Sequence, residues 1–146
     1  MIAVDTNILV YACRSEMPHH QKARALLSAL AEGEVRWAMP WPCAYELLKT
    51  VTHPRIFSQP TSLEDAVEDL ESMFDSPSLV MLGQGPMHRT HLHRAVLGGA
   101  AIGATIHDAH IAALALEHGV TELLTADRDF ARFPGLRVRN PFLSKG

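Results

Sequence analysis

The sequence lacks the features that would place a chain in or beyond a membrane. No apolar run in its 146 residues approaches the roughly 20 residues that a membrane-spanning helix needs. The apolar N-terminus has no basic stretch at its start and carries Asp5 within it. We therefore expect no signal peptide and no membrane association, and we expect the protein to stay in the cytoplasm.

Cysteine is also scarce, with only Cys13 and Cys43 in the whole chain. Both lie in apolar surroundings, where a free cysteine behaves as a small hydrophobic residue. Two isolated cysteines form neither a disulfide framework nor a thiolate metal cluster, which agrees with a reducing compartment.

Repeats, low-complexity tracts and long linkers are absent too. The chain is 47% hydrophobic and 20% charged, which is typical of a folded globular protein and not of a disordered one. Its length is that of one ordinary domain. We therefore predict a single domain over residues 1–146.

An excess of positive charge is missing as well, since the formal net charge is −3. Proteins that hold nucleic acid through phosphate contacts alone are usually basic. A carboxylate site lowers the global charge, however, and a bound cation reverses the local sign. The net charge therefore does not exclude a nucleic-acid enzyme.

Short β-prone apolar segments alternate with longer segments of helical periodicity. This alternation predicts an α/β fold with three layers, in which helices cover both faces of a short, mostly parallel sheet. The predicted strands are 2–4, 35–39, 79–82, 121–125 and 136–138. The predicted helices are 6–11, 22–31, 42–51, 62–74, 87–97 and 107–118, with a short helix or turn at 127–133.

Acidic residues follow two of the predicted strands. Asp5 ends the first strand and Asp127 lies just beyond the fourth. Ligands of open parallel sheets bind outside the carboxyl ends of the strands, so these distant acids can share one site. Asp108 opens the long helix 107–118, and Glu46 lies on the helix after the second strand.

Each acid also has a local explanation. Asp5 can cap a helix, Asp108 can favour a helix dipole, and Glu46 can simply face solvent. Asp127 and Asp129 frame a turn, where aspartate is common. Taken together, these explanations leave the placement at the strand ends unexplained, so we favour a shared acidic site.

The chemistry of such a site suits a hard cation. Mg²⁺ takes oxygen ligands, keeps several waters and uses a few carboxylates together with substrate phosphate; Mn²⁺ accepts the same donors. One or two such ions activate water and stabilise the leaving oxygen in phosphodiester hydrolysis. The clustered acids repel one another without metal.

The chain resembles the PIN-domain ribonucleases, in particular the VapC-type toxins of bacterial toxin–antitoxin pairs. Four segments carry the resemblance in the expected order and spacing, and together they span nearly the whole chain. They are IAVDTNILV at 2–10, CAYEL at 43–47, HDAHIAA at 107–113 and LTADRDF at 124–130.

The resemblance implies an acidic metal site and an endoribonuclease activity that depends on Mg²⁺ or Mn²⁺. It also implies a homodimer and an antitoxin whose C-terminal segment fills the active-site groove. The implied active-site acids are Asp5, Glu46, Asp108 and Asp127, and the implied metal ligands are Asp5, Asp108 and Asp127.

Supporting roles follow from the same resemblance. Thr6 or Asn7 would orient the acid at the end of the first strand, and Thr125 would support the fourth acid by hydrogen bonding. Asp129 is an auxiliary acid, and the choice between Asp127 and Asp129 as the fourth acid stays open.

Other side chains suggest alternatives. His107 and His110 are spaced i, i+3 and suggest zinc, but catalytic zinc wants three protein ligands. Trp37 and Trp41 are expected in core or dimer packing, because no basic cluster surrounds them to form a base-stacking platform. Arg14 can contact RNA or antitoxin, or serve only as an exposed charge.

Competing functions fit less well. A phosphatase of the haloacid-dehalogenase type needs a second aspartate two residues after the first, where this chain has Asn7. A DNA-cleaving relative would be expected to carry an extra DNA-clamping segment, and the small size of this chain leaves no room for one. A non-catalytic PIN-like module that binds RNA or protein is the main alternative, and the complete set of acids argues against it.

Overall fold

Five short apolar segments pair side by side into one sheet, as the computed structural model of the chain shows for residues 1–143. All four strand pairings are parallel. The strand order is β3-β2-β1-β4-β5. The strands are β1 (Ile2–Val4), β2 (Trp37–Pro40), β3 (Leu79–Leu82), β4 (Glu122–Leu124) and β5 (Val138–Arg139).

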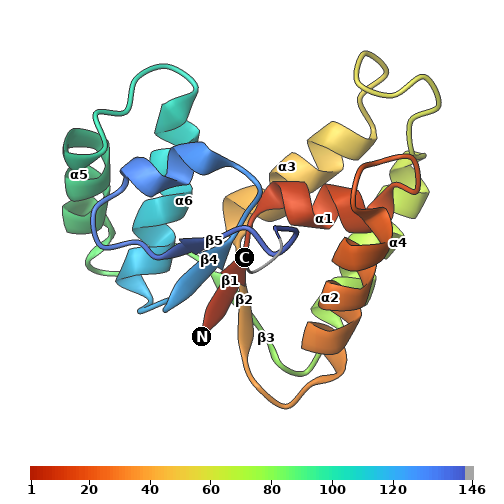
Figure 1. Ribbon diagram of the computed structural model, residues 1–146, viewed down its shortest axis with the longest axis horizontal. Helices are drawn as coiled ribbons and strands as arrows, with labels where there is room; N and C mark the ends of the chain where they lie inside the picture. Colours follow the sequence, from red (N-terminus) through yellow and green to blue (C-terminus); the bar gives the residue numbers. More distant parts are fainter. Residues whose placement is uncertain (144–146) are drawn as a thin grey trace.

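Helices cover both faces of this sheet, which confirms the predicted three-layer α/β fold. Helices α1 to α4 lie on one side, and α5 and α6 lie on the other (Figure 1). The helices are α1 (Thr6–Cys13), α2 (His20–Glu32), α3 (Trp41–Val51), α4 (Leu63–Phe74), α5 (His88–Gly98) and α6 (Thr105–Glu117), followed by the 3₁₀ helix η1 (Arg128–Arg132).

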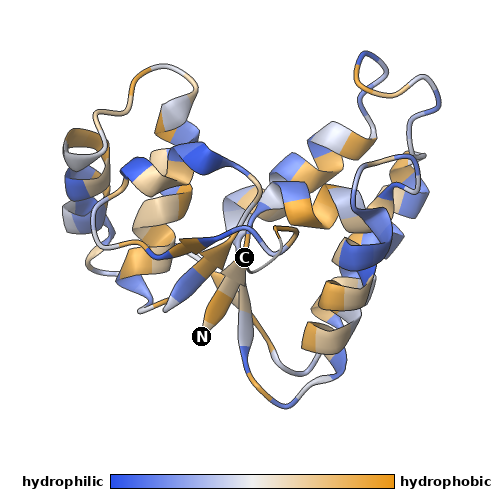
Figure 2. Ribbon diagram, in the orientation of Figure 1, coloured by the Kyte–Doolittle hydropathy of each residue, from blue (hydrophilic) through white to orange (hydrophobic). Residues whose placement is uncertain are grey.

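The hydrophobic core lies along the sheet, where apolar residues of the strands meet the inner faces of the helices (Figure 2). Strands covered on both faces have few positions for polar side chains, which is why the strand segments read as continuous apolar runs. Trp37 and Met39 of β2 are fully buried, as are Ile111 and Leu114 of α6. This burial stabilises each such side chain by roughly 1.5–3 kcal/mol.

The strand order contains one reversal of direction. The chain moves from β1 outward through β2 to β3, and then crosses over to β4 on the other side of β1. Right-handed crossovers place the connecting helices of the two halves on opposite faces. A crevice therefore opens at the carboxyl ends of β1 and β4, which is the topological switch point of the sheet.

Three strands have bounds that differ from those predicted, and the fourth strand is one residue shorter at each end, at Glu122–Leu124. The second strand begins at Trp37 and not at residue 35, because Val35 is 77% exposed and lies outside the ladder. The last strand is Val138–Arg139 and not 136–138. The N–H of Leu136 donates to the carbonyl of Phe133 inside a turn, so Leu136 packs in the core without joining the sheet.

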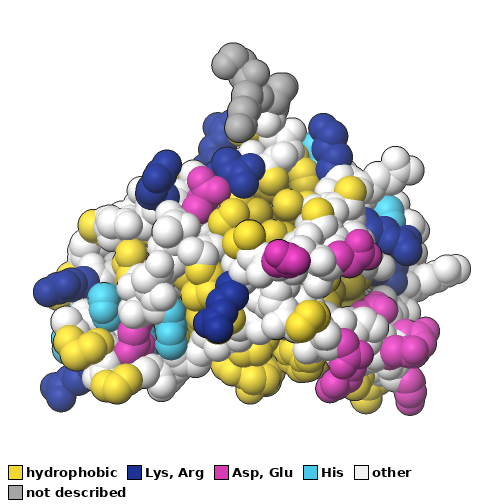
Figure 3. Space-filling view, turned by 90° about the horizontal axis from the view of Figure 1, so that it is seen from below, with side chains coloured by type: hydrophobic (Ala, Val, Ile, Leu, Met, Phe, Trp, Pro, Cys, Tyr) yellow, Lys and Arg dark blue, Asp and Glu magenta, His cyan; other side chains and the backbone are white. Residues whose placement is uncertain are grey.

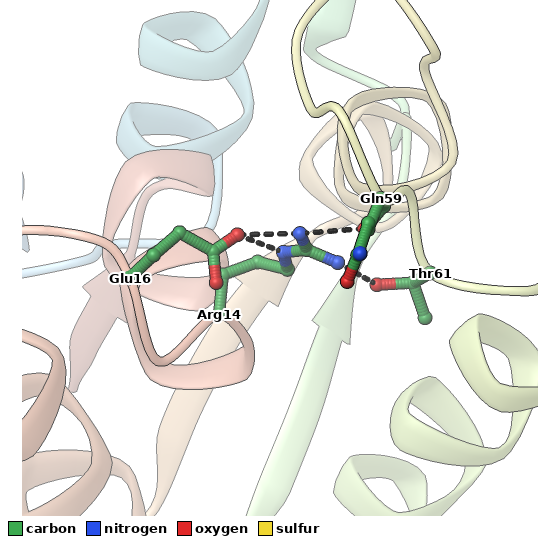
Figure 4. A network of polar contacts seen from close by, with 4 residues as sticks. All are labelled: Arg14, Glu16, Gln59 and Thr61. Atoms are coloured by element: carbon green, nitrogen blue, oxygen red, sulfur yellow. Dashed lines mark hydrogen bonds and ion pairs between the residues drawn. The ribbon is translucent and has the colours of Figure 1, made fainter.

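Arg14 ends α1 and fastens the loop that follows α3 (Figure 4). Its guanidinium donates to Thr61 Oγ1 at 2.9 Å and to the carbonyl of Gln59 at 2.8 Å, and it pairs with Glu16. It also lies over the ring of Phe57, 4.1 Å from the centroid. The guanidinium of Arg14, which was a candidate for binding RNA or antitoxin, is therefore engaged in contacts within the protein.

The surface charge is unevenly distributed. Helix α4 alone carries five acidic side chains, at positions 64, 65, 68, 69 and 71. In Figure 3 the acidic side chains gather on the side of the molecule that carries α4, and histidines gather on the opposite side. Within residues 1–143, no helix is long and apolar enough to cross a membrane.

Candidate active site

The carboxyl ends of β1 and β4 meet at the switch point, as predicted. The backbone N–H of Asp5 donates to the carbonyl of Leu124 at 3.0 Å, so the chain leaves the two strands at the same level. Asp5 is then the N-cap of α1, and Asp127 is the N-cap of η1. Both acids therefore stand at the mouth of the crevice.

Asp5 is buried and its carboxylate accepts four hydrogen bonds. Oδ1 accepts from the Thr6 N–H at 2.8 Å and from the Cys43 thiol at 3.7 Å. Oδ2 accepts from Thr125 Oγ1 at 2.7 Å and from Asn7 Nδ2 at 3.3 Å. These contacts fix the orientation of the carboxylate before any ligand binds.

The hydroxyl of Thr125 is the centre of this network. It donates to Asp5 and accepts from Asn7 Nδ2 and from the Asp127 N–H, both at 3.0 Å. Asn7 Oδ1 in turn accepts from the Ala126 N–H at 3.2 Å. One hydroxyl, with its single proton and two lone pairs all engaged, thus ties the first acid to the backbone of the fourth.

Glu46 is brought to the same place by α3, which follows β2. Thr6 Oγ1 donates to Glu46 Oε2 at 2.8 Å. Thr6 therefore serves two acids, with its backbone N–H on Asp5 and its hydroxyl on Glu46. This arrangement explains why a threonine at the start of α1 is useful beyond helix capping.

Asp108 lies in the first turn of α6, where the helix dipole favours a negative charge. Its pKa is nevertheless raised from 3.8 to about 6. Burial is the largest cause, and the negative charges of Asp127, Glu46 and Asp129 add to it, while Arg132 opposes them. Asp127, Glu46 and Asp129 are thus close enough to hinder the ionisation of Asp108.

The pKa of Asp5 is also raised from 3.8 to about 6. Burial is again the largest cause, and the charges of Glu46 and Asp108 act in the same direction. The hydrogen bonds from Thr125 and Thr6 oppose the shift, because they favour the ionised carboxylate. The predicted repulsion among the acids is therefore present.

A cleft of about 310 Å³ joins these side chains. All four predicted acids line it, whereas Asp129 does not. Asp129 is exposed, and its N–H donates to Asp127 Oδ1 at 2.9 Å. The residues that line the cleft are Asp5, Thr6, Asn7, Val10, Tyr11, Met17, Glu46, Thr50, Asp108 and Asp127.

Cys43 and Thr50 contribute to this site without having been predicted. The thiol of Cys43 contacts Asp5, and Thr50 lines the cleft. Both are on α3 at positions −3 and +4 from Glu46, a spacing that places all three on one face of a helix. This helical spacing from Glu46 is the feature of the sequence from which Cys43 and Thr50 could have been predicted to line the site.

The donor set of the cleft suits a hard cation. It consists of carboxylate, amide and hydroxyl oxygens, which are the ligands that Mg²⁺ prefers. A cation there would also offset the burial and the repulsion that together raise the pKa of Asp5 and Asp108. Among residues 1–143, no three side chains of His, Cys, Asp or Glu already converge closely enough to hold a metal ion.

The zinc interpretation of His107 and His110 gains no support from the described part of the chain. No group of three such ligands is assembled there. The ring of His110 instead packs edge-on against His88, with centroids 5.4 Å apart. His110 thus belongs to the contact between α5 and α6.

The fold and the acidic cleft together define a class of protein, and the comparison with known families agrees. The PIN-domain family model matches residues 2–136. The chain belongs to the PIN-domain family.

Within that family, the chain is similar to named ribonucleases. It is 38% identical to ribonuclease VapC43 of Mycobacterium tuberculosis, over 97% of this chain and 95% of the relative. It is 33% identical to ribonuclease VapC48 of the same species, over 94% of this chain and 95% of the relative.

Solved structures share the fold at lower identity. VapBC2 from Rickettsia felis, bound to a promoter DNA fragment, matches with a TM-score of 0.70 and 22% identity, over 96% of this chain and 98% of that one. The toxin VapC20 of Mycobacterium tuberculosis, described as cleaving the sarcin–ricin loop, matches with a TM-score of 0.69 and 14% identity, over 96% of this chain and all of that one.

Proposed function

We propose that the chain is a metal-dependent endoribonuclease whose active-site acids are Asp5, Glu46, Asp108 and Asp127. One observation carries the proposal. Four acids from four separate segments of the chain line a single cleft at the switch point of the sheet. Relatives that are 38% and 33% identical over nearly the whole chain are named ribonucleases, which supports the same activity here.

We assign Asp5, Asp108 and Asp127 to the binding of Mg²⁺ or Mn²⁺. When bound, such a cation lowers the pKa of a coordinated water and neutralises charge on the scissile phosphate. The contribution of the protein is to hold the three carboxylates in place. Asp5 is oriented by four hydrogen bonds, and Asp127 is tied to it through Thr125.

Glu46 has a different role in this proposal. Its Oε2 is engaged by Thr6, which fixes the carboxylate, and its other oxygen, Oε1, accepts the proton of the attacking water. Arg128 and Arg132 follow Asp127 and are exposed, so they are placed to contact the phosphate backbone of RNA. None of the residues that line the cleft belongs to the acidic helix α4.

The main alternative is a PIN-like module that binds RNA or protein without cutting it. The mutual repulsion of the acids argues against this alternative. Burial and mutual repulsion both hinder the ionisation of Asp5 and Asp108, which destabilises the fold at neutral pH, and a bound cation would offset both effects.

We further propose that the chain is the toxin of a toxin–antitoxin pair, acting in the cytoplasm as a homodimer of single-domain subunits. A similar fold occurs in a toxin–antitoxin complex from Klebsiella pneumoniae, with a TM-score of 0.63. Co-purification with the product of a neighbouring small open reading frame tests the antitoxin. Light scattering after size exclusion tests the dimer, and a strict monomer would refute it.

The experiment that tests the activity is cleavage of a mixed RNA pool by purified protein with Mg²⁺ or Mn²⁺. We expect cutting that disappears with EDTA and in the Asp5→Ala variant. Glu68→Ala is the matched control, because it removes an exposed acid of α4 far from the cleft. Cutting that persists in Asp5→Ala would dissociate the activity from this site. Binding of RNA without cutting in every metal would favour the non-catalytic module.

A further inference from the structure

A second cavity adjoins the active-site cleft. It has a volume of about 580 Å³ and lies between α3, α6 and the turn after β3. Glu46 lines both the cavity and the cleft. His107 lines the cavity, and its neighbour Asp108 lines the cleft. The two hollows therefore lie next to each other, with Glu46 and the start of α6 between them.

One wall of the cavity is an aromatic pair that lies largely outside the core. Trp37 is buried, as expected of a core residue, whereas Trp41 is 39% exposed and Tyr45 is 65% exposed. One side of Trp41 packs on Phe74, with centroids 5.7 Å apart, and the expected alternative of dimer packing stays a prediction. The rings of Trp41 and Tyr45 are stacked, with centroids 6.1 Å apart and planes inclined by 29°. Their spacing of four residues places them on one face of α3.

Polar side chains line another part of the rim. Lys49 continues the aromatic face by one more helical turn, Gln84 follows β3, and His107 lies at the start of α6. All three are exposed and line the cavity. An aromatic face bordered by an amide, an imidazole and an ammonium group matches a flat ring whose edges carry hydrogen-bond donors and acceptors.

We infer that this cavity holds one unpaired nucleobase of the RNA, next to the phosphate that is cut. The inference rests on the proposed ribonuclease function and adds a specificity pocket to it. The base stacks on the pair formed by Trp41 and Tyr45, while Gln84 and His107 face its edges. A stacked base of this kind has left its duplex, so the enzyme selects single-stranded segments and loops.

The size and the position of the cavity favour this occupant. Pockets for small ligands measure about 300–1,000 Å³, and this one falls within that range. The shared Glu46 places the base beside the reacting phosphate, as the substrate chain itself requires. A second copy of the protein is the other possible occupant, and the test separates the two.

The test uses the two tryptophans as reporters. In an Asp108→Asn background, which avoids cleavage, single-stranded octamers of U, A and C are titrated while tryptophan emission is recorded. An octamer without bases provides the same phosphates and no ring. We expect quenching by at least one base-containing octamer and not by the abasic one. Trp41→Phe should remove the quenching, because the remaining Trp37 is only 1% exposed.

Tyr45→Ala should weaken binding of the quenching octamer by about 5- to 100-fold, in line with measured base–aromatic stacking. Tyr45→Phe should restore it. Leu63→Ala, which removes an exposed apolar side chain from α4, should leave binding unchanged. Tyr45 is so exposed that its loss is not expected to impair folding.

Three results would overturn the inference. They are equal binding of abasic and base-containing octamers, unchanged binding in Tyr45→Ala, and a shift of Tyr45→Ala from dimer to monomer with unaltered RNA binding. The last would assign the cavity to a contact between subunits. If the wild type still cuts RNA in these cases, the inference of a base-binding pocket is wrong and the proposed ribonuclease function is unaffected. If no RNA is bound or cut, both proposals fail.

Discussion

Thr125 Oγ1 donates a hydrogen bond of 2.7 Å to Asp5 Oδ2, joining two residues that are 120 positions apart in the chain. The same hydroxyl accepts the backbone N–H of Asp127 at 3.0 Å. One side chain thus links the first and fourth acids directly, and it neither binds metal nor reacts in the proposed mechanism.

Replacing Thr125 by valine keeps the volume and removes the hydroxyl. The Asp127 N–H then loses its acceptor and Asp5 loses its shortest hydrogen bond, so we expect a loss of about 1–3 kcal/mol in the free energy of unfolding. RNA cleavage should fall as well. Urea denaturation and cleavage assays measure the two effects, and Thr125→Ser should recover both. Wild-type cleavage in Thr125→Val would show that the network does not position the acids.

Asp108→Asn removes one of the repelling charges of the cleft. We expect cleavage to fall by about 100-fold or more, because the proposed metal loses a carboxylate ligand. The metal-free fold should at the same time gain about 1–4 °C in melting temperature, since a partly buried charge is removed. Unchanged turnover in this variant would exclude Asp108 from the mechanism.

The raised pKa values of Asp5 and Asp108 make stability depend on pH. Both carboxyls have a pKa of about 6 in the folded protein, compared with 3.8 normally. The folded state therefore binds these protons more tightly than the unfolded chain does. The resulting stabilisation is complete below pH of about 4 and is lost as the pH rises through about 6.

We therefore expect this contribution to lower the melting temperature of the protein in EDTA as the pH is raised from 5 to 7. Other groups also titrate in this range, so the comparison with Asp108→Asn isolates the effect. The variant should lose less stability over the interval than the wild type. Parallel curves for the two proteins would contradict the assignment.

A divalent cation should stabilise the wild-type fold by binding only to it. Free Mg²⁺ at 100 times its dissociation constant adds about 2.7 kcal/mol to the free energy of unfolding. We expect millimolar Mg²⁺ or Mn²⁺ to raise the melting temperature of the wild type and of Glu68→Ala, but not that of Asp5→Ala. If the shift is the same in all three proteins, the cation binds elsewhere.

Arg14 offers a contrasting prediction, because its contacts are internal. Arg14→Gln loses the stacking on Phe57 and the hydrogen bonds to the loop, so we expect a loss of about 1–2 kcal/mol in stability. Cleavage by the protein that remains folded should be unaffected. A selective loss of RNA binding at unchanged stability would instead show that Arg14 contacts the substrate.

Much of the fold was predictable because the strands are apolar and lie between two layers of helices. Continuous apolar runs such as 2–4 and 79–82 have no other place in a small α/β protein, and both strands occur as predicted. The boundaries at Val35 and Leu136 were not predictable from polarity. An exposed valine in a loop and a buried leucine in a turn both resemble strand residues locally.

The site was predictable where topology governs it. The rule that ligands lie at the carboxyl ends of parallel strands places Asp5 and Asp127 together without knowledge of any contact. The part played by Cys43 was missed because its apolar surroundings favour a core residue, and its contact with Asp5 depends on the exact rotation of α3. For Trp41 the sequence left core packing and dimer packing open, because composition does not reveal which helix face lacks a covering element.

The strand order also has a consequence for the order in which the site forms during folding. The partner of β1 on its β4 side is residues 122–124, and the hydroxyl that holds Asp5 belongs to Thr125. A partly folded chain in which β4 has not yet paired with β1 lacks both this hydrogen bond and the crevice between the two strands. The acidic site is therefore completed by a contact between residues 120 positions apart in the chain, and long-range pairings of this kind slow folding.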